Sequence, residues 1–202
     1  AFGSSALYSN TTGLYNSAFG FNALYNNTTA NQNSAFGYQA LNGTTTGGNN
    51  CAFGLQALYT NSTGVSNSAF GFNALFYSTG SYNVAVGQDA LNKNTTANGN
   101  TAAGYRALYS NTTSAYNTAV GYSSLTTNTT GTGEAFGVNA LCSNTTGTYN
   151  QAFSRVFSGS YTGGYTGTFT GAYTGDYTGA FSGIYSGLFV GKFTGLYTGI
   201  FN

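Results

Sequence analysis

The chain repeats one short phrase every 16 or 17 residues, and this period constrains its fold more than any other feature. A leading alanine is followed by a mostly apolar residue, a glycine, two variable residues and then usually Ala-Leu. A period this short indicates one small structural unit stacked on copies of itself, so the sequence predicts a rod. The leading alanines are Ala1, Ala18, Ala35, Ala52, Ala69, Ala85, Ala102, Ala119, Ala135 and Ala152.

Each phrase alternates between small and bulky side chains, which is the pattern of a strand. In the second unit, Phe19 and Phe21 fall on one face of a strand, while Ala18, Gly20 and Asn22 fall on the other. A helix is disfavoured, because every unit has a glycine inside the phrase and a Thr/Asn/Gly run after it. We therefore expect an all-β fold, a β-solenoid of about nine coils, with two short strands and two turns in each coil.

Stacked coils place like residues over like, so some columns of the repeat are candidate hydrogen-bond ladders. The Asn-Thr-Thr-Gly run and the Asn before the leading Ala supply the turns. A variable column two residues after each Gly is mostly polar, and its consecutive members Asp89 and Arg106 predict an ion pair between neighbouring coils. That column is Ser5, Asn22, Gln39, Gln56, Asn73, Asp89, Arg106, Ser123 and Asn139.

The tandem motif Asn-Ser/Thr-Ala-x-Gly-x-x-Ala-Leu, over roughly residues 1–153, resembles the head repeats of trimeric autotransporter adhesins and related repeats of phage tail fibres. The resemblance implies a left-handed parallel β-roll with three chains side by side, and the small Ala/Gly face set against a neighbouring chain. These units are longer than the family's by the Asn-Thr-Thr-Gly turn. The family's coiled-coil stalk and membrane anchor have no counterpart in this sequence.

The period changes after Arg155, which divides the chain into a repeat domain, 1–156, and a tail, 157–202. The tail repeats aromatic-Ser/Thr-Gly-x, a composition that favours strand over helix. As one extended strand it would reach about 150 Å, and the stacked coils only about 45 Å. We therefore expect a long extended β tail that pairs with neighbouring subunits, because its aromatic side chains and backbone would otherwise stay exposed.

The candidate assembly residues of the tail are its aromatic side chains and two charged ones. Asp176 and Lys192 are 16 residues apart, so a stagger of four quartets between neighbouring chains would bring them together. The full set is Tyr161, Phe169, Asp176, Tyr177, Phe181, Tyr185, Phe189, Lys192, Phe193, Tyr197 and Phe201.

Composition excludes several classes of function. The chain has no His and only three carboxylates, so no catalytic acid pair, triad or metal cluster is expected, and we expect neither an enzyme nor a cofactor. A net charge of +1 argues against nucleic acid as a partner. No apolar run approaches about 18 residues, so no membrane-spanning helix is expected. Cys51 and Cys142 should lie about 24 Å apart along the stack, too far for a disulfide within one chain.

The motif Asn-x-Ser/Thr recurs and has two main interpretations. In a secreted eukaryotic protein it would mark glycan acceptors, whereas Asn-Thr-Thr is also simply good turn chemistry. Glycans on Thr are a further alternative, and ice binding by the Thr columns is the least favoured because adjacent Thr face opposite ways on a strand. The candidate acceptors are Asn10, Asn27, Asn61, Asn94, Asn111, Asn128 and Asn144.

These observations favour the structural subunit of an extracellular self-assembling fibre, either a cell-surface appendage or a virion fibre. Its partners would be copies of itself, joined by strand pairing through the tail. The alternative is a trimeric adhesin or phage tail-fibre protein that binds a host surface or glycan through patterned aromatics and amides. The sequence starts in the middle of its phrase, so residues are expected to precede Ala1.

Overall fold

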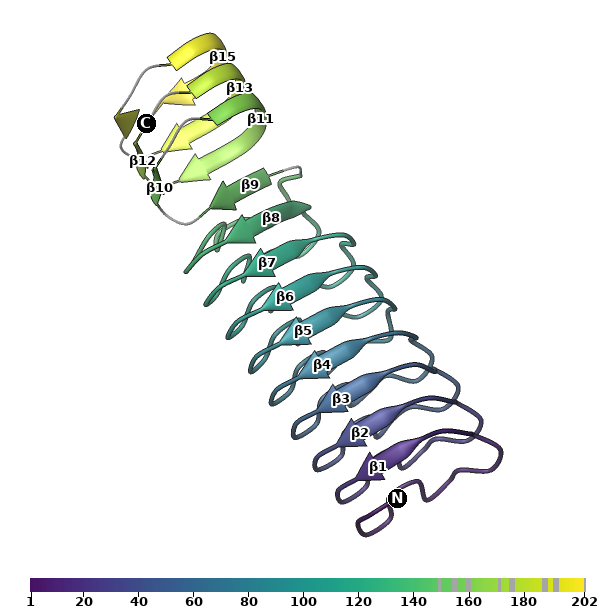
Figure 1. Cartoon of the computed structure of the whole chain (residues 1–202). Coiled ribbons are helices and arrows are strands. Elements are labelled where there is room, and N and C mark those ends of the chain that lie inside the picture. The colour runs from purple at the N-terminus through teal and green to yellow at the C-terminus, as the bar shows by residue number, and fades with distance from the viewer. Residues whose placement is uncertain are drawn as a thin grey trace.

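The computed structural model describes residues 1–148, 150–153, 156–158, 161–170, 172–174, 177–186, 189–190 and 193–201. These residues contain no helix, and the chain winds into an elongated β-solenoid with its two ends at opposite ends of the rod (Figure 1). The all-β solenoid expected from the sequence is confirmed. We call each stretch from one leading alanine to the next a coil, so that coils 1–9 begin at Ala1, Ala18, Ala35, Ala52, Ala69, Ala85, Ala102, Ala119 and Ala135.

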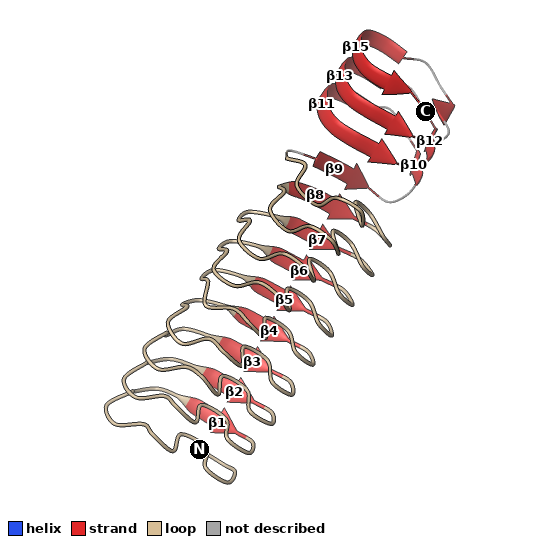
Figure 2. Cartoon of the chain, turned by 180° about the vertical axis from the view of Figure 1, so that it is seen from behind, coloured by secondary structure: helices blue, strands red, loops and turns tan. Residues whose placement is uncertain are grey.

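The coils build one parallel sheet of nine strands, in chain order, along one side of the rod (Figure 2). The leading alanines pair in register, as in Ala18 with Ala35 and Ala35 with Ala52. The strands are β1 (Ser17–Phe19), β2 (Ser34–Phe36), β3 (Cys51–Phe53), β4 (Ser68–Phe70), β5 (Val84–Val86), β6 (Thr101–Ala103), β7 (Thr118–Val120), β8 (Gly133–Phe136) and β9 (Asn150–Phe153).

Among the described residues, coils 2–9 each hold one strand, not the two that the sequence predicted, and coil 1 contributes an isolated bridge between Phe2 and Phe19. The rest of the coil is turns, which are nevertheless bonded from coil to coil. The N–H of Leu24, for example, donates to the carbonyl of Ala40 at 3.0 Å, and that of Asn26 to Asn42 at 3.1 Å. Hydrogen bonds to the neighbouring coil therefore hold the turns in place in the same way as they hold the strand.

The small face of the repeat is the interior of the rod. Ala18, Ala23 and Leu24 are fully buried, and the equivalent residues of the other coils form one continuous core. Phe19 and Phe21 remain about half exposed on the outside. The predicted alternation is confirmed, but the Ala/Gly face packs within the coil and not against another chain, because so narrow a coil has room only for small side chains and one Leu.

The backbone turns sharply at positions that repeat in every coil. At Gly71 φ is +140°, and a Cβ there would lie 2.6 Å from the carbonyl oxygen of Gly87 in the next coil, so only glycine fits. The core leucine is also left-handed: Leu75 has φ of 53° and Leu91 of 51°. A left-handed leucine costs about 1–2 kcal/mol, and burial of its side chain offsets that cost.

The described tail continues the winding of the rod. Its strands are β10 (Val156–Ser158), β11 (Tyr161–Thr170), β12 (Ala172–Thr174), β13 (Tyr177–Ser186), β14 (Phe189–Val190) and β15 (Phe193–Phe201). They pair in two parallel sheets, β10-β12-β14 and β11-β13-β15, and β11 lies beside β9 at the end of the repeat domain (Figure 1).

The tail is thus β-structured as expected, but it differs from one long extended strand. Residues 16 apart pair throughout, as in Tyr161 with Tyr177 and Tyr177 with Phe193. Sixteen residues are four quartets, so each turn places aromatic beside aromatic and glycine beside glycine. The self-pairing satisfies backbone groups that an extended strand would leave open.

Truncation of one core leucine tests the packing of the interior. We expect Leu75→Ala to lower the free energy of unfolding by about 2–5 kcal/mol, because the neighbouring coils cannot collapse onto the cavity. The matched control is Leu55→Ala, since Leu55 is exposed on the outer side. Urea denaturation followed by circular dichroism measures both; equal losses in the two variants would contradict the assigned interior.

Candidate assembly surfaces and asparagine columns

A row of side chains, one per coil and phenylalanine in coils 1–5 and 9, runs along the outer face of the sheet. We call the residue after each leading alanine the Phe column. Adjacent rings stack at the coil spacing, with centroids 4.7 Å apart for Phe19–Phe36, 4.5 Å for Phe36–Phe53 and 5.3 Å for Phe53–Phe70. The column is Phe2, Phe19, Phe36, Phe53, Phe70, Val86, Ala103, Val120 and Phe136.

A second outer row, two residues further on, is mostly apolar. It includes stacked pairs, Phe21–Tyr38 at 5.3 Å and Tyr105–Tyr122 at 5.0 Å. Neither row contains a charged side chain in coils 1–9. This outer row is Ser4, Phe21, Tyr38, Leu55, Phe72, Gln88, Tyr105, Tyr122 and Val138. The two rows give the rod a largely apolar stripe without charged members, and the guanidinium of Arg106 lies over the ring of Tyr105 within it.

The candidate glycan acceptors form a buried ladder, the first Asn column. Asn111 donates from Nδ2 to Oδ1 of Asn94 at 3.1 Å and to the carbonyl of Ser114 at 2.9 Å. Its own Oδ1 accepts from Asn128 at 3.2 Å. Each amide of the column closes its own turn, and all but Asn61 also bond to a side chain of a neighbouring coil, which is the turn chemistry that the sequence offered as the second interpretation.

Burial leaves these amides unavailable for a glycan in the folded chain. Asn27, Asn61, Asn94, Asn111 and Asn128 are fully buried and their Nδ2 atoms all donate within the core. The two end members, Asn10 and Asn144, are part-buried and make the same bonds to Gly13 and Gly147.

The first Thr of each pair is also part of this network. Oγ1 of Thr45, for example, donates to the carbonyl of Ser62 in the next coil at 3.1 Å, while the following Thr46 is exposed. The Asn-Thr-Thr run therefore acts as a corner that is tied both within its own coil and to the coil beyond.

A second Asn column lies in the turn before each leading alanine, where the sequence predicted a turn residue but not a ladder. Oδ1 of Asn50 accepts the backbone N–H of Asn67 at 2.9 Å, and Oδ1 of Asn67 accepts that of Asn83 at 3.0 Å. Nδ2 of Asn50 donates to the carbonyl of Gly64 at 2.9 Å. The members are Asn16, Asn33, Asn50, Asn67, Asn83, Asn100 and Asn117. The presence of Asn at this position in nearly every repeat is the sequence feature that could have predicted the ladder.

The first Asn column is interrupted at Thr44. Its Oγ1 is buried without a hydrogen-bond partner, and so are Oδ1 of Asn27 and Oδ1 of Asn61, its neighbours in the column. In this column each Oδ1 accepts from the amide of the following coil, as Asn10 accepts from Asn27. Oδ1 of Asn27 is therefore left open by Thr44, and Oδ1 of Asn61 by Ser78, which is a second interruption of the column, because neither short side chain reaches the oxygen as an amide does.

The polar variable column forms only part of the ladder expected of it. Gln56 donates to Gln39 at 2.9 Å, which confirms the stacking at one step. The predicted ion pair between Asp89 and Arg106 is wrong, although the two residues do lie on consecutive coils. Arg106 instead lies over the ring of Tyr109, 4.5 Å from its centroid, and a hydrogen bond to Tyr109 raises the pKa of the guanidinium. The ring faces of Tyr105 and Tyr109 offer the guanidinium cation–π contacts, and the charge of Asp89 also contributes to its raised pKa.

The candidate assembly residues of the tail fall into stacked columns. Backbone pairing joins Tyr161, Tyr177 and Phe193 in one column and Phe169, Tyr185 and Phe201 in another. Phe181 pairs with Tyr197, and Phe189 with Tyr173. Asp176 and Lys192 lie outside the described residues.

The cysteines and carboxylates form no reactive cluster in the part of the chain described. Cys51 and Cys142 are both free, and burial raises the pKa of the Cys51 thiol. Among the described residues no three His, Cys, Asp or Glu side chains gather where they could hold a metal ion. Nor do those residues include a helix long and apolar enough to cross a membrane.

Comparison with known proteins found no matching family model, no matching curated protein and no matching solved structure. The resemblance of the motif to adhesin head repeats is therefore left as an expectation.

Loss of a buried ladder amide is expected to destabilise the rod. Asn111→Ala removes the hydrogen bond that the Asn94 oxygen accepts, and an unsatisfied buried group costs about 1–3 kcal/mol. The Ser114 carbonyl and the Asn128 amide each lose one of two bonds, because Asn117 still donates to Ser114 and Asn128 to Gly131. The control is Asn26→Ala, since Asn26 is exposed and its backbone bond to Asn42 is unchanged. Thermal unfolding compares them, and an Asn111 variant as stable as the control would contradict the ladder.

Replacing Thr44 by the amide that the column lacks should stabilise the rod, the opposite of the effect expected for Asn111→Ala. We expect Thr44→Asn to raise the free energy of unfolding by about 1 kcal/mol, because the new amide can donate to Asn27 and accept from Asn61. Thr46→Asn, at an exposed position of the same corner, is the control. A destabilised Thr44 variant in the same unfolding assay would mean that the gap holds something other than unsatisfied oxygens.

Proposed function

We propose that the chain is the repeating structural subunit of an extracellular self-assembling fibre. The solenoid supplies a stiff rod, since every coil is bonded to its neighbours in strand, turn and side chain. The tail supplies the joint between subunits by strand pairing. No enzymatic role is part of this proposal, because the described residues bring no acid, base and nucleophile together.

The observation that supports the joint most directly is the constant stagger of the tail. All pairs in β11, β13 and β15 join residues 16 apart, so each strand presents the same order of aromatic, hydroxyl and glycine to the next. Among the described residues β15 pairs on one edge only, with β13. A tail strand from a second chain would match that edge as well as the chain's own strands match each other.

The charge pair of the tail fits the same stagger. Asp176 and Lys192 are separated by 16 residues in the sequence, the interval that separates every pair in the flanking strands. That interval recurs between strands of one chain, and β13 is already paired on both edges, so the charge pair gives the joint between chains no separate support.

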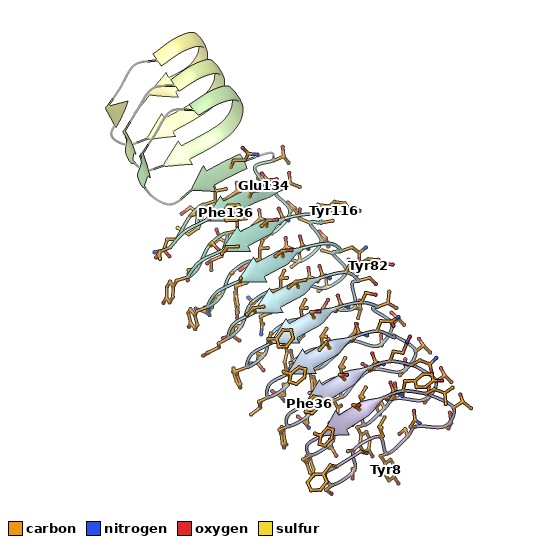
Figure 3. The ribbon with its side chains drawn as sticks, in the orientation of Figure 1. Tyr8, Phe36, Tyr82, Tyr116, Glu134 and Phe136 are labelled. Carbon is orange, nitrogen blue, oxygen red and sulfur yellow. The ribbon has the colours of Figure 1, made fainter. Side chains whose placement is uncertain are left out.

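A second candidate is an adhesin or phage tail fibre that binds a surface glycan. Two tyrosines favour it: Tyr82 and Tyr116 are 65% and 79% exposed at equivalent positions of coils 5 and 7 (Figure 3). Exposed aromatic rings are suited to stacking on the apolar face of a sugar. Discrete needles with threefold symmetry, in negative-stain electron microscopy, would favour this candidate over helical filaments.

Proline in the last tail strand tests the fibre. We expect Thr194→Pro with Thr198→Pro to abolish filaments in electron micrographs, because proline cannot donate to a strand ladder and its ring blocks a paired neighbour. The matched control replaces the same two residues with Val, which keeps strand propensity and should keep the filaments. Circular dichroism should show an unchanged solenoid in both variants.

Two outcomes would count against the fibre. One is a proline variant that still forms filaments of normal length. The other is an unaltered protein that stays monodisperse and monomeric at high concentration.

A further inference from the structure

The Phe column is graded in size along the rod. Coils 1–5 carry phenylalanine, whereas coils 6, 7 and 8 carry Val86, Ala103 and Val120, and coil 9 returns to Phe136. All are in equivalent positions of paired strands, so the backbone beneath them is level. The outer face of the sheet is therefore raised by rings over coils 3–5 and hollow over coils 6–8.

This face is open and apolar in both halves. Phe53 is 37% exposed and Phe70 41% on the raised half, and Val86 is 44% exposed in the hollow. Phe36 and Phe136, from opposite ends of the row, lie on the same side of the rod (Figure 3). Because the rings stack face to face along the column, their faces are covered by one another and only their edges point outward. A sugar, which stacks on ring faces, has no platform on this row.

A second copy of this chain fits the row if it lies face to face and antiparallel. A two-fold axis parallel to the strands, between coils 5 and 6, sets coil 5 against coil 6, coil 4 against coil 7 and coil 3 against coil 8. Phe70 then meets Val86 of the other copy, Phe53 meets Ala103 and Phe36 meets Val120. Each of these three rings enters a hollow of its partner, whereas Phe19 meets Phe136 ring to ring at the margin, and the symmetry makes every such contact twice.

The competing parallel arrangement lacks this match. It would set Phe against Phe in coils 1–5 and leave Ala103 facing Ala103 across a void, and packed interfaces do not tolerate such gaps. Only a partner whose side chains repeat at the coil spacing can fill the row along its length, and a copy of this chain has that spacing by construction. We propose that the solenoids pair as antiparallel dimers through the Phe column.

The second outer row does not add to the match of large and small side chains. The axis leaves each row facing its own copy, so Phe72 meets Gln88, but Leu55 meets Tyr105 and Tyr38 meets Tyr122. No like charges meet, because neither row carries a charge. The pairing uses coils 1–9 alone and does not depend on the tail joint proposed above. If both hold, each dimer carries one tail at each end.

Thiol cross-linking of the full chain tests the pairing and its direction. In a Cys51→Ser, Cys142→Ser background, we compare Phe53→Cys, Ala103→Cys and the double variant. Two sheets packed face to face lie about 10 Å apart, beyond the roughly 7 Å between bridged Cα atoms, so a short bismaleimide replaces a disulfide. The antiparallel dimer predicts efficient covalent dimers for the double variant and for a mixture of the two single variants, and few for either single variant alone.

Exchange of knob and hollow tests the fit itself. Phe53→Ala and Ala103→Phe should each weaken the dimer by about tenfold or more in sedimentation velocity, since each affects a central contact. The variant with both changes should regain the affinity, because the ring and the hollow have traded places on both copies. Both positions face outward, so folding is retained and is checked by circular dichroism.

Three outcomes overturn the proposal. Single variants that cross-link as well as the double variant would mean a parallel contact. Absence of cross-links at concentrations where filaments form would mean that the row is not a contact between copies, and binding of another macromolecule to it would have the same meaning. An exchange variant weaker than both single variants would refute the knob-and-hollow match. Loss of filaments with retained cross-links would instead refute the tail joint alone.

Discussion

Hydrogen bonding between equivalent positions of successive coils is the interaction on which the rest of the rod depends. It involves the strand, the turns and two columns of buried asparagines, so a coil removed from its neighbours would leave most of its polar groups unpaired. The glycine column belongs to the same constraint, because the coils approach so closely there that a Cβ at Gly71 would collide with the next carbonyl. Stability is therefore a property of neighbouring coils and not of any coil alone.

The sequence predicted the features that follow from its period. The solenoid, the parallel register and the alternation of Ala18 with Phe19 all come from like residues stacked over like. It did not predict which face is inside, because alternation is symmetrical with respect to the two faces. Burial of the smaller face follows from the width of a 17-residue coil, which the sequence does not state. The left-handed backbone of Leu75 could not be predicted from the sequence either, since leucine seldom adopts this conformation unless packing imposes it.

The candidate sites show the same division between what the repeat pattern predicts and what only the structure shows. Asn111 and its equivalents were correctly seen as a repeated feature, but only coordinates distinguish an exposed sequon from an inward ladder. The pairing of Asp89 with Arg106 failed for a local reason, the ring of Tyr109 beside the guanidinium. In the tail, the four-residue repeat indicated strands but not where the chain turns, because every quartet looks alike. The spacing of Asp176 and Lys192 suggested a 16-residue stagger between chains, but the structure was needed to show that this stagger occurs within one chain.

The interior that each coil carries, one leucine, its small neighbours and a pair of amides, is the same in coil 2 as in coil 7. A tandem duplication or loss of one unit in the gene would thus add or remove one layer without requiring a new core, and rod length can drift at little cost to folding. The Phe column is different, because its large and small side chains match those of a second copy only about one fixed midpoint, between coils 5 and 6. A change in the number of coils would displace that midpoint, so selection for pairing through this face would keep the number of coils constant.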